Sequence, residues 1–112
     1  METTRQQKIS KQIQKDIAEI IQREFSFQLR GILVTVTTVR VSVDLAYAKI
    51  YVSVFPFEKA QSTLAFLEEQ NRAIRGALGN RMRNQVKSIP ELQFFIDASL
   101  EYIENIDNLL AK

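Results

Sequence analysis

The feature that most constrains the fold is a pair of strand-like segments that lie next to each other along the chain. Residues 32–43 are rich in β-branched side chains, and apolar residues alternate there with polar ones, as in a strand with one buried face. Residues 48–55 repeat the alternation, and Pro56 ends it. Because only a short turn separates the two segments, we expect an antiparallel hairpin.

The alternation in the first segment slips by one residue at Thr37 and Thr38. The valines before this point fall on even positions, up to Val36, and those after it fall on odd positions, from Val39 onward. One extra residue in a strand moves every later side chain to the opposite face of the sheet. The slip therefore predicts a bulge or a bend at these two threonines.

Segments with helical periodicity lie on both sides of the hairpin. Apolar residues form one helical stripe over residues 9–25. We expect this helix to end around Phe25 to Leu29, with Gly31 as a break. A second helical stretch runs from residue 57 or 58 to residue 87, and Pro90 stops it. It is long for one helix in a small domain, so we expect a break within it.

A third strand and a last helix complete the predicted domain. Leu92, Phe94 and Ile96 alternate with polar or outward positions, and Asp97 can cap a final helix over about residues 98–111. The order is helix, strand, strand, helix, helix, strand, helix. It predicts a single α+β domain over residues 1–112, with a three-stranded sheet and the helices packed on one face. Because the third strand returns only after the long helical stretch, the sheet need not be wholly antiparallel.

The composition argues against catalysis and against a metal site. The chain has no histidine and no cysteine, which removes the commonest general base and the commonest metal ligands. An enzyme would depend on residues such as Asp97, Glu101 or Lys49, and no pair of these has a spacing that suggests acid–base chemistry. We therefore expect no catalytic residue, cofactor, metal or small-molecule substrate.

The first residues lack the apolar run of a secretory signal, and no stretch approaches the roughly 20 apolar residues of a membrane span. The simplest expectation is a soluble, cytoplasmic, monomeric protein that makes no contact with a membrane.

The charged residues are segregated along the chain, although the formal net charge is only +2. Residues 3–15 and residues 70–90 carry bases and no acid, whereas residues 91–107 carry acids and no base. Clusters of bases attract polyanions. For the first cluster an ordinary solvated helix face explains the charge equally well, whereas the second favours phosphate contact. The bases are Arg5, Lys8, Lys11 and Lys15 in the first cluster and Arg72, Arg75, Arg81, Arg83 and Lys87 in the second.

Glycine and arginine share one side of the second helical stretch. At about 100° per residue, Arg72, Arg75, Gly76, Gly79 and Arg83 fall in one sector of the helical wheel, away from the apolar stripe. Each glycine costs a helix about 1 kcal/mol relative to alanine. One explanation is that the absence of side chains lets an RNA backbone come close to the helix, where the guanidinium groups bind its phosphates. The alternative is that a glycine lets another segment pack closely or marks a helix break.

Gly76 and Gly79 also have the spacing of the GxxG loop with which KH domains hold single-stranded RNA. In KH domains that loop joins two helices, whereas here the helical period continues across it to Met82. We therefore interpret the match as coincidental.

A rival RNA surface is the outer face of the predicted sheet. Tyr51 and Phe95 could stack on bases there, with Lys49 and Thr35 nearby. The alternative is that these two rings pack under the final helix.

Three stretches resemble the ribosome-binding factor A family, and together they span about 100 residues. Residues 34–55 are similar to the family's hairpin, including a Ser…Asp-Leu…Ala-Lys pattern at its turn. The motif Ile74-Arg-Gly-Ala-Leu-Gly-Asn-Arg-Met-Arg83 resembles a helix motif of the family. Residues 90–97, followed by Ser99 and residues 106–110, resemble its carboxy-terminal signature.

The resemblance implies a KH-like fold of the second type, in which an Ala-x-Gly kink between the two central helices replaces the GxxG loop. The kink positions align here with Gln70, Asn71 and Arg72, so this chain has neither the alanine nor the glycine. A gentler kink, or one made by Asn71, is the expected consequence.

The resemblance also implies binding to the small ribosomal subunit and its rRNA, near the 5′ end of the precursor. It implies a role in late assembly and rRNA processing, including at low temperature. Arg75, Arg81 and Arg83 match the family's basic motif and Gly79 its glycine, whereas Arg72 and Lys87 rest on charge alone. The alternative function is a basic module that binds an acidic protein partner. The predicted RNA-binding residues are Arg72, Arg75, Gly76, Gly79, Arg81, Arg83, Lys87, Lys8, Lys11 and Lys15.

Overall fold

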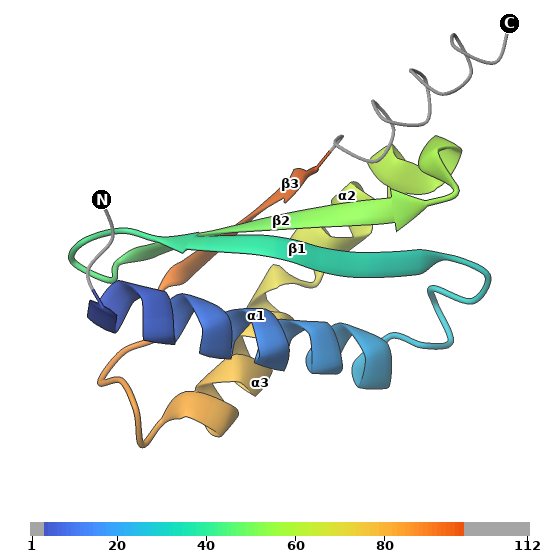
Figure 1. Cartoon of the computed structure of the whole chain (residues 1–112). Helices are drawn as coiled ribbons and strands as arrows, with labels where there is room; N and C mark the ends of the chain where they lie inside the picture. The colour runs from blue at the N-terminus through green and yellow to red at the C-terminus, as the bar shows by residue number, and fades with distance from the viewer. Residues whose placement is uncertain (1–3, 98–112) are drawn as a thin grey trace, which may run out of the picture.

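The computed structural model describes residues 4–97 of the chain. Figure 1 shows a sheet with helices below and behind it. The predicted order of helix, strand, strand, helix, helix and strand is confirmed, and the final predicted helix lies outside the described residues. In chain order the elements are α1 (Thr4–Glu24), β1 (Leu33–Val41), β2 (Tyr47–Phe55), the 3-10 turn η1 (Phe57–Lys59), α2 (Ala60–Glu69), α3 (Asn71–Met82) and β3 (Glu91–Ile96).

The sheet is mixed, with β2 at its centre. β2 pairs antiparallel with β1, as the short turn between them requires, and parallel with β3. A parallel partner needs a crossover connection, which α2 and α3 supply. The expectation that the sheet is not wholly antiparallel is therefore confirmed.

The predicted bulge in the first strand is also confirmed. The register between β1 and β2 shifts between Val36 and Thr38, which leaves Thr37 as the extra residue. The Thr37 hydroxyl donates to Oδ2 of Asp97 at 2.6 Å and lies 3.2 Å from the carbonyl oxygen of Tyr51. Asp97 thus joins the end of β3 to the bulge, and the helix that it was expected to cap lies beyond the described segment.

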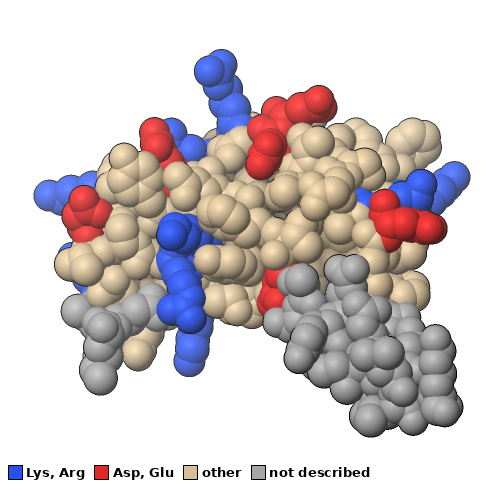
Figure 2. Space-filling view, turned by 90° about the horizontal axis from the view of Figure 1, so that it is seen from above, with Lys and Arg blue, Asp and Glu red and all other residues tan. Residues whose placement is uncertain are grey.

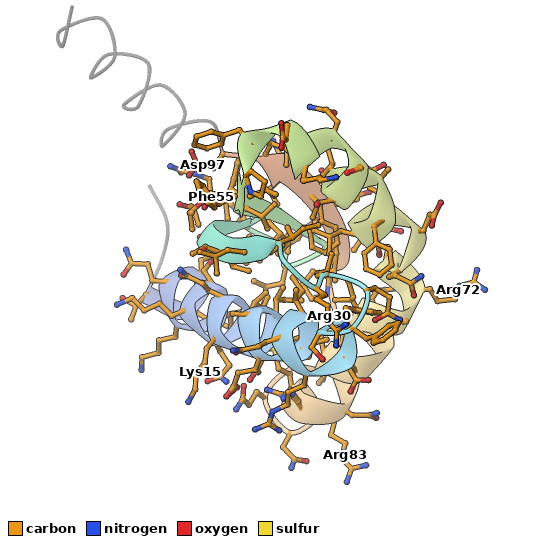
Figure 3. The ribbon with its side chains drawn as sticks, turned by 90° about the vertical axis from the view of Figure 1, so that its right-hand side faces the viewer. Lys15, Arg30, Phe55, Arg72, Arg83 and Asp97 are labelled. Carbon is orange, nitrogen blue, oxygen red and sulfur yellow. The ribbon has the colours of Figure 1, made fainter. Side chains whose placement is uncertain are left out.

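The helices pack on one side of the sheet, which is visible end-on in Figure 3. Between them and the sheet lies one continuous apolar core. Burial of a large aliphatic side chain contributes about 1.5–3 kcal/mol, so this layer supplies most of the stabilisation of the domain. Its fully buried members include Ile13 and Ile17 of α1, Ile50 and Val52 of β2, Leu67 of α2, and Ile74, Leu78 and Met82 of α3.

The expected break in the long helical stretch occurs at Gln70. This residue leaves helical geometry, with φ −91° and ψ 7°, between α2 and α3. The next residue, Asn71, donates from Nδ2 to the carbonyl oxygen of Leu92 in β3 at 2.8 Å. The chain thus has a break here without alanine or glycine, and the Asn71 amide ties the start of α3 to the sheet. Gly76 and Gly79 lie inside α3, so their KH-like spacing is coincidental.

The outer edge of β1 is covered by glutamines of α1. Gln6 donates to the carbonyl oxygen of Val41 at 2.9 Å, and Gln14 donates to those of Val36 and Thr37 at 3.1 and 3.3 Å. Unpaired carbonyl groups at a sheet edge are a template for pairing with another chain. Gln6 and Gln14 donate hydrogen bonds to three of these carbonyl groups.

Candidate nucleic-acid interface

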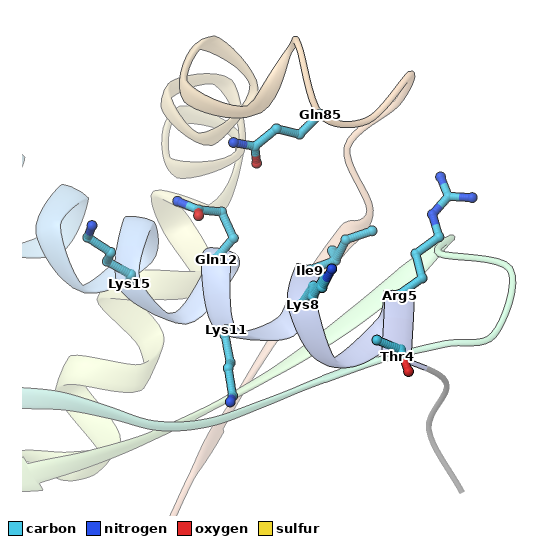
Figure 4. Close-up of a pocket in the computed structure, with 8 residues that line it drawn as sticks. All are labelled: Thr4, Arg5, Lys8, Ile9, Lys11, Gln12, Lys15 and Gln85. Carbon is cyan, nitrogen blue, oxygen red and sulfur yellow. The ribbon is translucent and has the colours of Figure 1, made fainter.

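The basic side of α1 lines a shallow groove. Its apolar stripe faces the core, so the lysines at the remaining helical positions face solvent. The groove has a volume of about 840 Å³ and is closed on one side by Gln85, which follows α3. Gln12 extends toward Gln85, whereas Lys11 leaves the opposite side of the helix (Figure 4). The lining residues are Thr4, Arg5, Lys8, Ile9, Lys11, Gln12, Lys15 and Gln85.

A second hollow of about 450 Å³ adjoins the first. Arg5 and Gln85 line both hollows, so together they make one surface. The segment after α3 adds Arg83 and Lys87 to it. We call this the α1–α3 basic surface, and its cations are Arg5, Lys8, Lys11, Lys15, Arg83 and Lys87.

Asp44 is the one acid among the described residues that line these two hollows. Its carboxylate accepts hydrogen bonds from the Ser42 hydroxyl at 2.8 Å and from the Ala46 backbone N–H at 3.1 Å. These bonds, with Ser42 first, lower the pKa of Asp44. Asp44 is therefore ionised at neutral pH and organises the turn between β1 and β2, at the margin of the basic surface.

The arginines that share one sector of the helical wheel have different surroundings in the structure. Arg75 donates from Nε to the carbonyl oxygen of Pro90 at 3.1 Å and from Nη2 to that of Ile89 at 2.6 Å. It therefore anchors the loop that leads into β3. Arg72 and Arg83 both point to solvent but at opposite ends of α3 (Figure 3).

Arg81 lies on another side of α3, against α1. Its Nη1 contacts Oδ1 of Asp16 at 3.3 Å and Oε2 of Glu19 at 2.8 Å. The bond to Glu19, then that to Asp16, raises the pKa of Arg81 despite some desolvation. The resemblance to the family counts Arg81 among the RNA-binding residues, but in the structure its guanidinium pairs with two carboxylates of α1.

The two glycines of α3 have different surroundings. A Cβ at Gly79 would lie 3.4 Å from Cγ1 of Ile89, in van der Waals contact with the loop before β3. A Cβ at Gly76 would meet nothing within 4 Å. Gly76 instead borders a small open hollow with Arg72, Arg75 and Ile89. The packing explanation therefore fits Gly79, and close approach of a ligand fits only Gly76.

Arg72 has a mixed electrostatic environment. It lines a hollow of about 600 Å³ together with Glu68, Glu69 and Glu91. These acids belong to α2 and β3, so the charge pattern of residues 70–90 could not reveal them. Phosphate contact is consequently better supported on the α1–α3 basic surface than at Arg72.

Arg5 and Gln85 are not among the site residues predicted from the sequence, although Arg5 belongs to the first basic cluster. Only packing brings the start of α1 next to the end of α3, and no spacing along the chain signals it. Within residues 4–97, no group of three or more acidic, histidine or cysteine side chains could hold a metal ion. Nor is any helix of that segment long and apolar enough to cross a membrane.

Comparison with known proteins connects this geometry to one family. The family model described as ribosome-binding factor A matches residues 5–110. The chain is 45% identical to ribosome-binding factor A of Flavobacterium johnsoniae over 112 residues, which cover 99% of this chain and 86% of that protein. It is 35% identical to that of Cytophaga hutchinsonii, over 100% of this chain and 84% of the other.

Two Thermus thermophilus structures have the same fold. The crystal structure of ribosome-binding factor A from this organism superposes with a TM-score of 0.70 and 28% identity, covering 81% of this chain and 94% of that one. A homology model of the Thermus protein, fitted into a cryo-EM map of a 30S complex with ribosome-binding factor A, gives a TM-score of 0.64 and 30% identity. It covers 80% of this chain and 91% of the other.

Proposed function

Because this chain belongs to the ribosome-binding factor A family, we propose that it binds the small ribosomal subunit through rRNA phosphates on the α1–α3 basic surface. The relatives are named as binding factors, and one of them is described in complex with the 30S particle. Acting as a cytoplasmic monomer, the protein assists late assembly and rRNA processing near the 5′ end of the precursor, including at low temperature.

One observation carries the assignment of the surface. Six cations from two segments distant in sequence line adjoining hollows, and Asp44 is the only acid among the described residues there. Within residues 4–97, the ion pairs involve Arg81 and none of these six. Cations without carboxylate partners are available for phosphates, and each contact formed releases condensed counterions.

The physical mechanism is binding without chemistry. The fold sets the positions from which the cations extend, so folded rRNA is recognised mainly through its phosphates and shape, with little base reading. A protein that binds one local RNA conformation more tightly than another shifts the population toward it. No bond needs to be made or broken for this protein to guide assembly.

The test is co-sedimentation with purified small subunits at several salt concentrations. The double variant Lys8→Ala with Arg83→Ala removes one cation from each of the two hollows. Both side chains are exposed. We expect weaker association and a salt dependence whose slope falls by about two, one for each lost phosphate contact.

A matched control removes the same charge elsewhere. Arg23→Ala with Lys59→Ala deletes two exposed cations outside both hollows. Equal weakening by the two double variants would reject the surface assignment. Nuclease treatment separates the alternative function, because binding to an acidic protein partner would persist after the RNA has been digested.

A further inference from the structure

The outer face of the sheet carries a second basic and aromatic surface, on the side away from the helices. We propose that it binds single-stranded RNA, with bases stacked on Tyr51 and Phe95 and phosphates at Arg40 and Lys49. The inference presupposes that the protein acts on RNA, as proposed above, but it uses residues that the α1–α3 basic surface does not.

The aromatic part is a stacked pair of rings. Tyr51 of β2 and Phe95 of β3 are directly paired in the sheet, and their ring centroids lie 5.4 Å apart with an interplanar angle of 26°. Their neighbours Ile50, Val52 and Phe94 point into the core, so both rings stand on the outer face. Phe95 is 38% exposed. A pair of stacked rings has two outer faces, and stacking on such faces is tolerant of base identity.

The cationic part carries a cost for the fold. Arg40 and Lys49 are directly opposite each other in the antiparallel ladder, and both are exposed. Like charges in that position destabilise a sheet. Among residues 4–97 no carboxylate forms an ion pair with either side chain. A bound polyanion would remove the repulsion between Arg40 and Lys49, so binding explains why two cations face each other here.

The two parts are adjacent. Lys49 and Tyr51 are two residues apart on β2, so they share a face at about 6.6–6.8 Å along the strand. Seen from above, blue atoms form a row to the left of the centre of a face that is otherwise mostly uncharged (Figure 2). Charge and ring faces therefore occur side by side, as recognition of phosphates and unpaired bases requires.

Acidic groups restrict where a strand of RNA can lie. On the outer face, Glu91 begins β3 and Asp97 follows it, and the Asp97 carboxylate accepts a hydrogen bond from Thr37. Both acids are on the β3 side of the sheet. The phosphates would consequently pass over β1 and β2, and the bases would turn toward Tyr51 and Phe95.

The experiment measures the affinity of the full chain for a labelled oligouridylate and for an RNA duplex of equal length. Tyr51→Leu with Phe95→Leu keeps apolar side chains but removes both rings. We expect about ten-fold weaker binding of the single strand, as loss of base stacking predicts, and unchanged binding of the duplex. Phe27→Leu is the control, since it removes a ring that is 78% exposed and lies outside the sheet, between α1 and β1.

Tyrosine fluorescence is a second readout. The chain has three tyrosines and no tryptophan, so a base stacked on Tyr51 should quench the share of the emission that comes from this one residue. Tyr51→Phe keeps the ring and should retain the affinity while most of the quenching disappears. Quenching of undiminished size in Tyr51→Phe would overturn the placement of the base, because Tyr47, which is exposed on the same face of β2, would then be its source.

Two results would reject the inference and leave the proposed function intact. One is unchanged affinity for oligouridylate in the double-leucine variant while Lys8→Ala with Arg83→Ala still weakens binding to small subunits. The other is competition by polyglutamate as effective as that by oligouridylate, because that polymer has charge but no bases. If the Lys8 and Arg83 variant also leaves subunit binding unchanged, the proposed function fails as well.

Discussion

Arg81 shows how the same residue type has different roles on one helix. Its guanidinium joins α3 to α1 through Asp16 and Glu19, and Gln12 also donates to Asp16 at 3.0 Å. Asp16 is only 6% exposed, so its carboxylate depends on these partners. Arg81 thus links two helices although it belongs to a basic cluster, whereas the nearby Arg83 is exposed and can contact a ligand.

Arg81→Met should lower the melting temperature by several degrees, because it leaves Asp16 without its cationic partner. Adding Asp16→Asn should recover part of that loss, so the two effects will not add. Thermal unfolding of the two single variants and the double variant measures this. The double variant should bind small subunits as tightly as the unmodified protein, and weakened binding would show that Arg81 contacts RNA.

Gly76 and Gly79 should respond differently to alanine. Gly76→Ala should stabilise the protein by about 1 kcal/mol, since alanine favours the helix and the space beside it is empty. Gly79→Ala should gain less, because its methyl group would meet the Ile89 side chain at 3.4 Å and leave it less room to move. Urea unfolding gives both values. If Gly76→Ala stabilises the fold and weakens binding to small subunits, a ligand approaches the backbone there.

At the scale of elements, α1 combines three functions on its different sides. One side packs on the sheet, one presents lysines to solvent, and one places glutamine amides on the carbonyl groups of β1. The last arrangement matters because β1 is an edge strand of nine residues. Its carbonyl groups would otherwise be open to pairing with a second molecule.

Gln14→Leu should expose that edge. The substitution leaves the carbonyl groups of Val36 and Thr37 without a donor from α1 and should cost about 1 kcal/mol. We expect concentration-dependent self-association by light scattering. Gln7→Leu adds the same apolar surface at an exposed position of α1. Equal association of the two variants would attribute the effect to hydrophobicity and not to the strand edge.

At the scale of the whole molecule, the helix side and the outer sheet face carry separate clusters of cations, although the net charge is only +2. If all six cations of the α1–α3 basic surface meet phosphates, the logarithm of the association constant should fall with the logarithm of salt concentration with a slope of about −5. Sedimentation between low and physiological salt measures this slope. A slope near zero would exclude phosphate contact as the main source of affinity.

The local patterns of the sequence were sufficient for the elements of the fold. Alternation predicted all three strands, the phase slip predicted the bulge at Thr37, and the length of residues 57–87 predicted a break that the structure has at Gln70. Such features depend on neighbours along the chain, because the period of a strand or helix decides which side chains share a face. Motifs at known spacing along the chain were likewise sufficient to indicate the family.

What the sequence could not decide is which side chains meet across the fold. The helical wheel placed Arg72, Arg75 and Arg83 in one sector, but only packing supplies the loop carbonyls to Arg75. Packing likewise supplies the carboxylates of α1 to Arg81. Packing also places Arg5 and Gln85 at the same hollow, although they are 80 positions apart in the sequence. Helical period determines the direction of a side chain, whereas its partner depends on the tertiary arrangement of segments that no local pattern encodes.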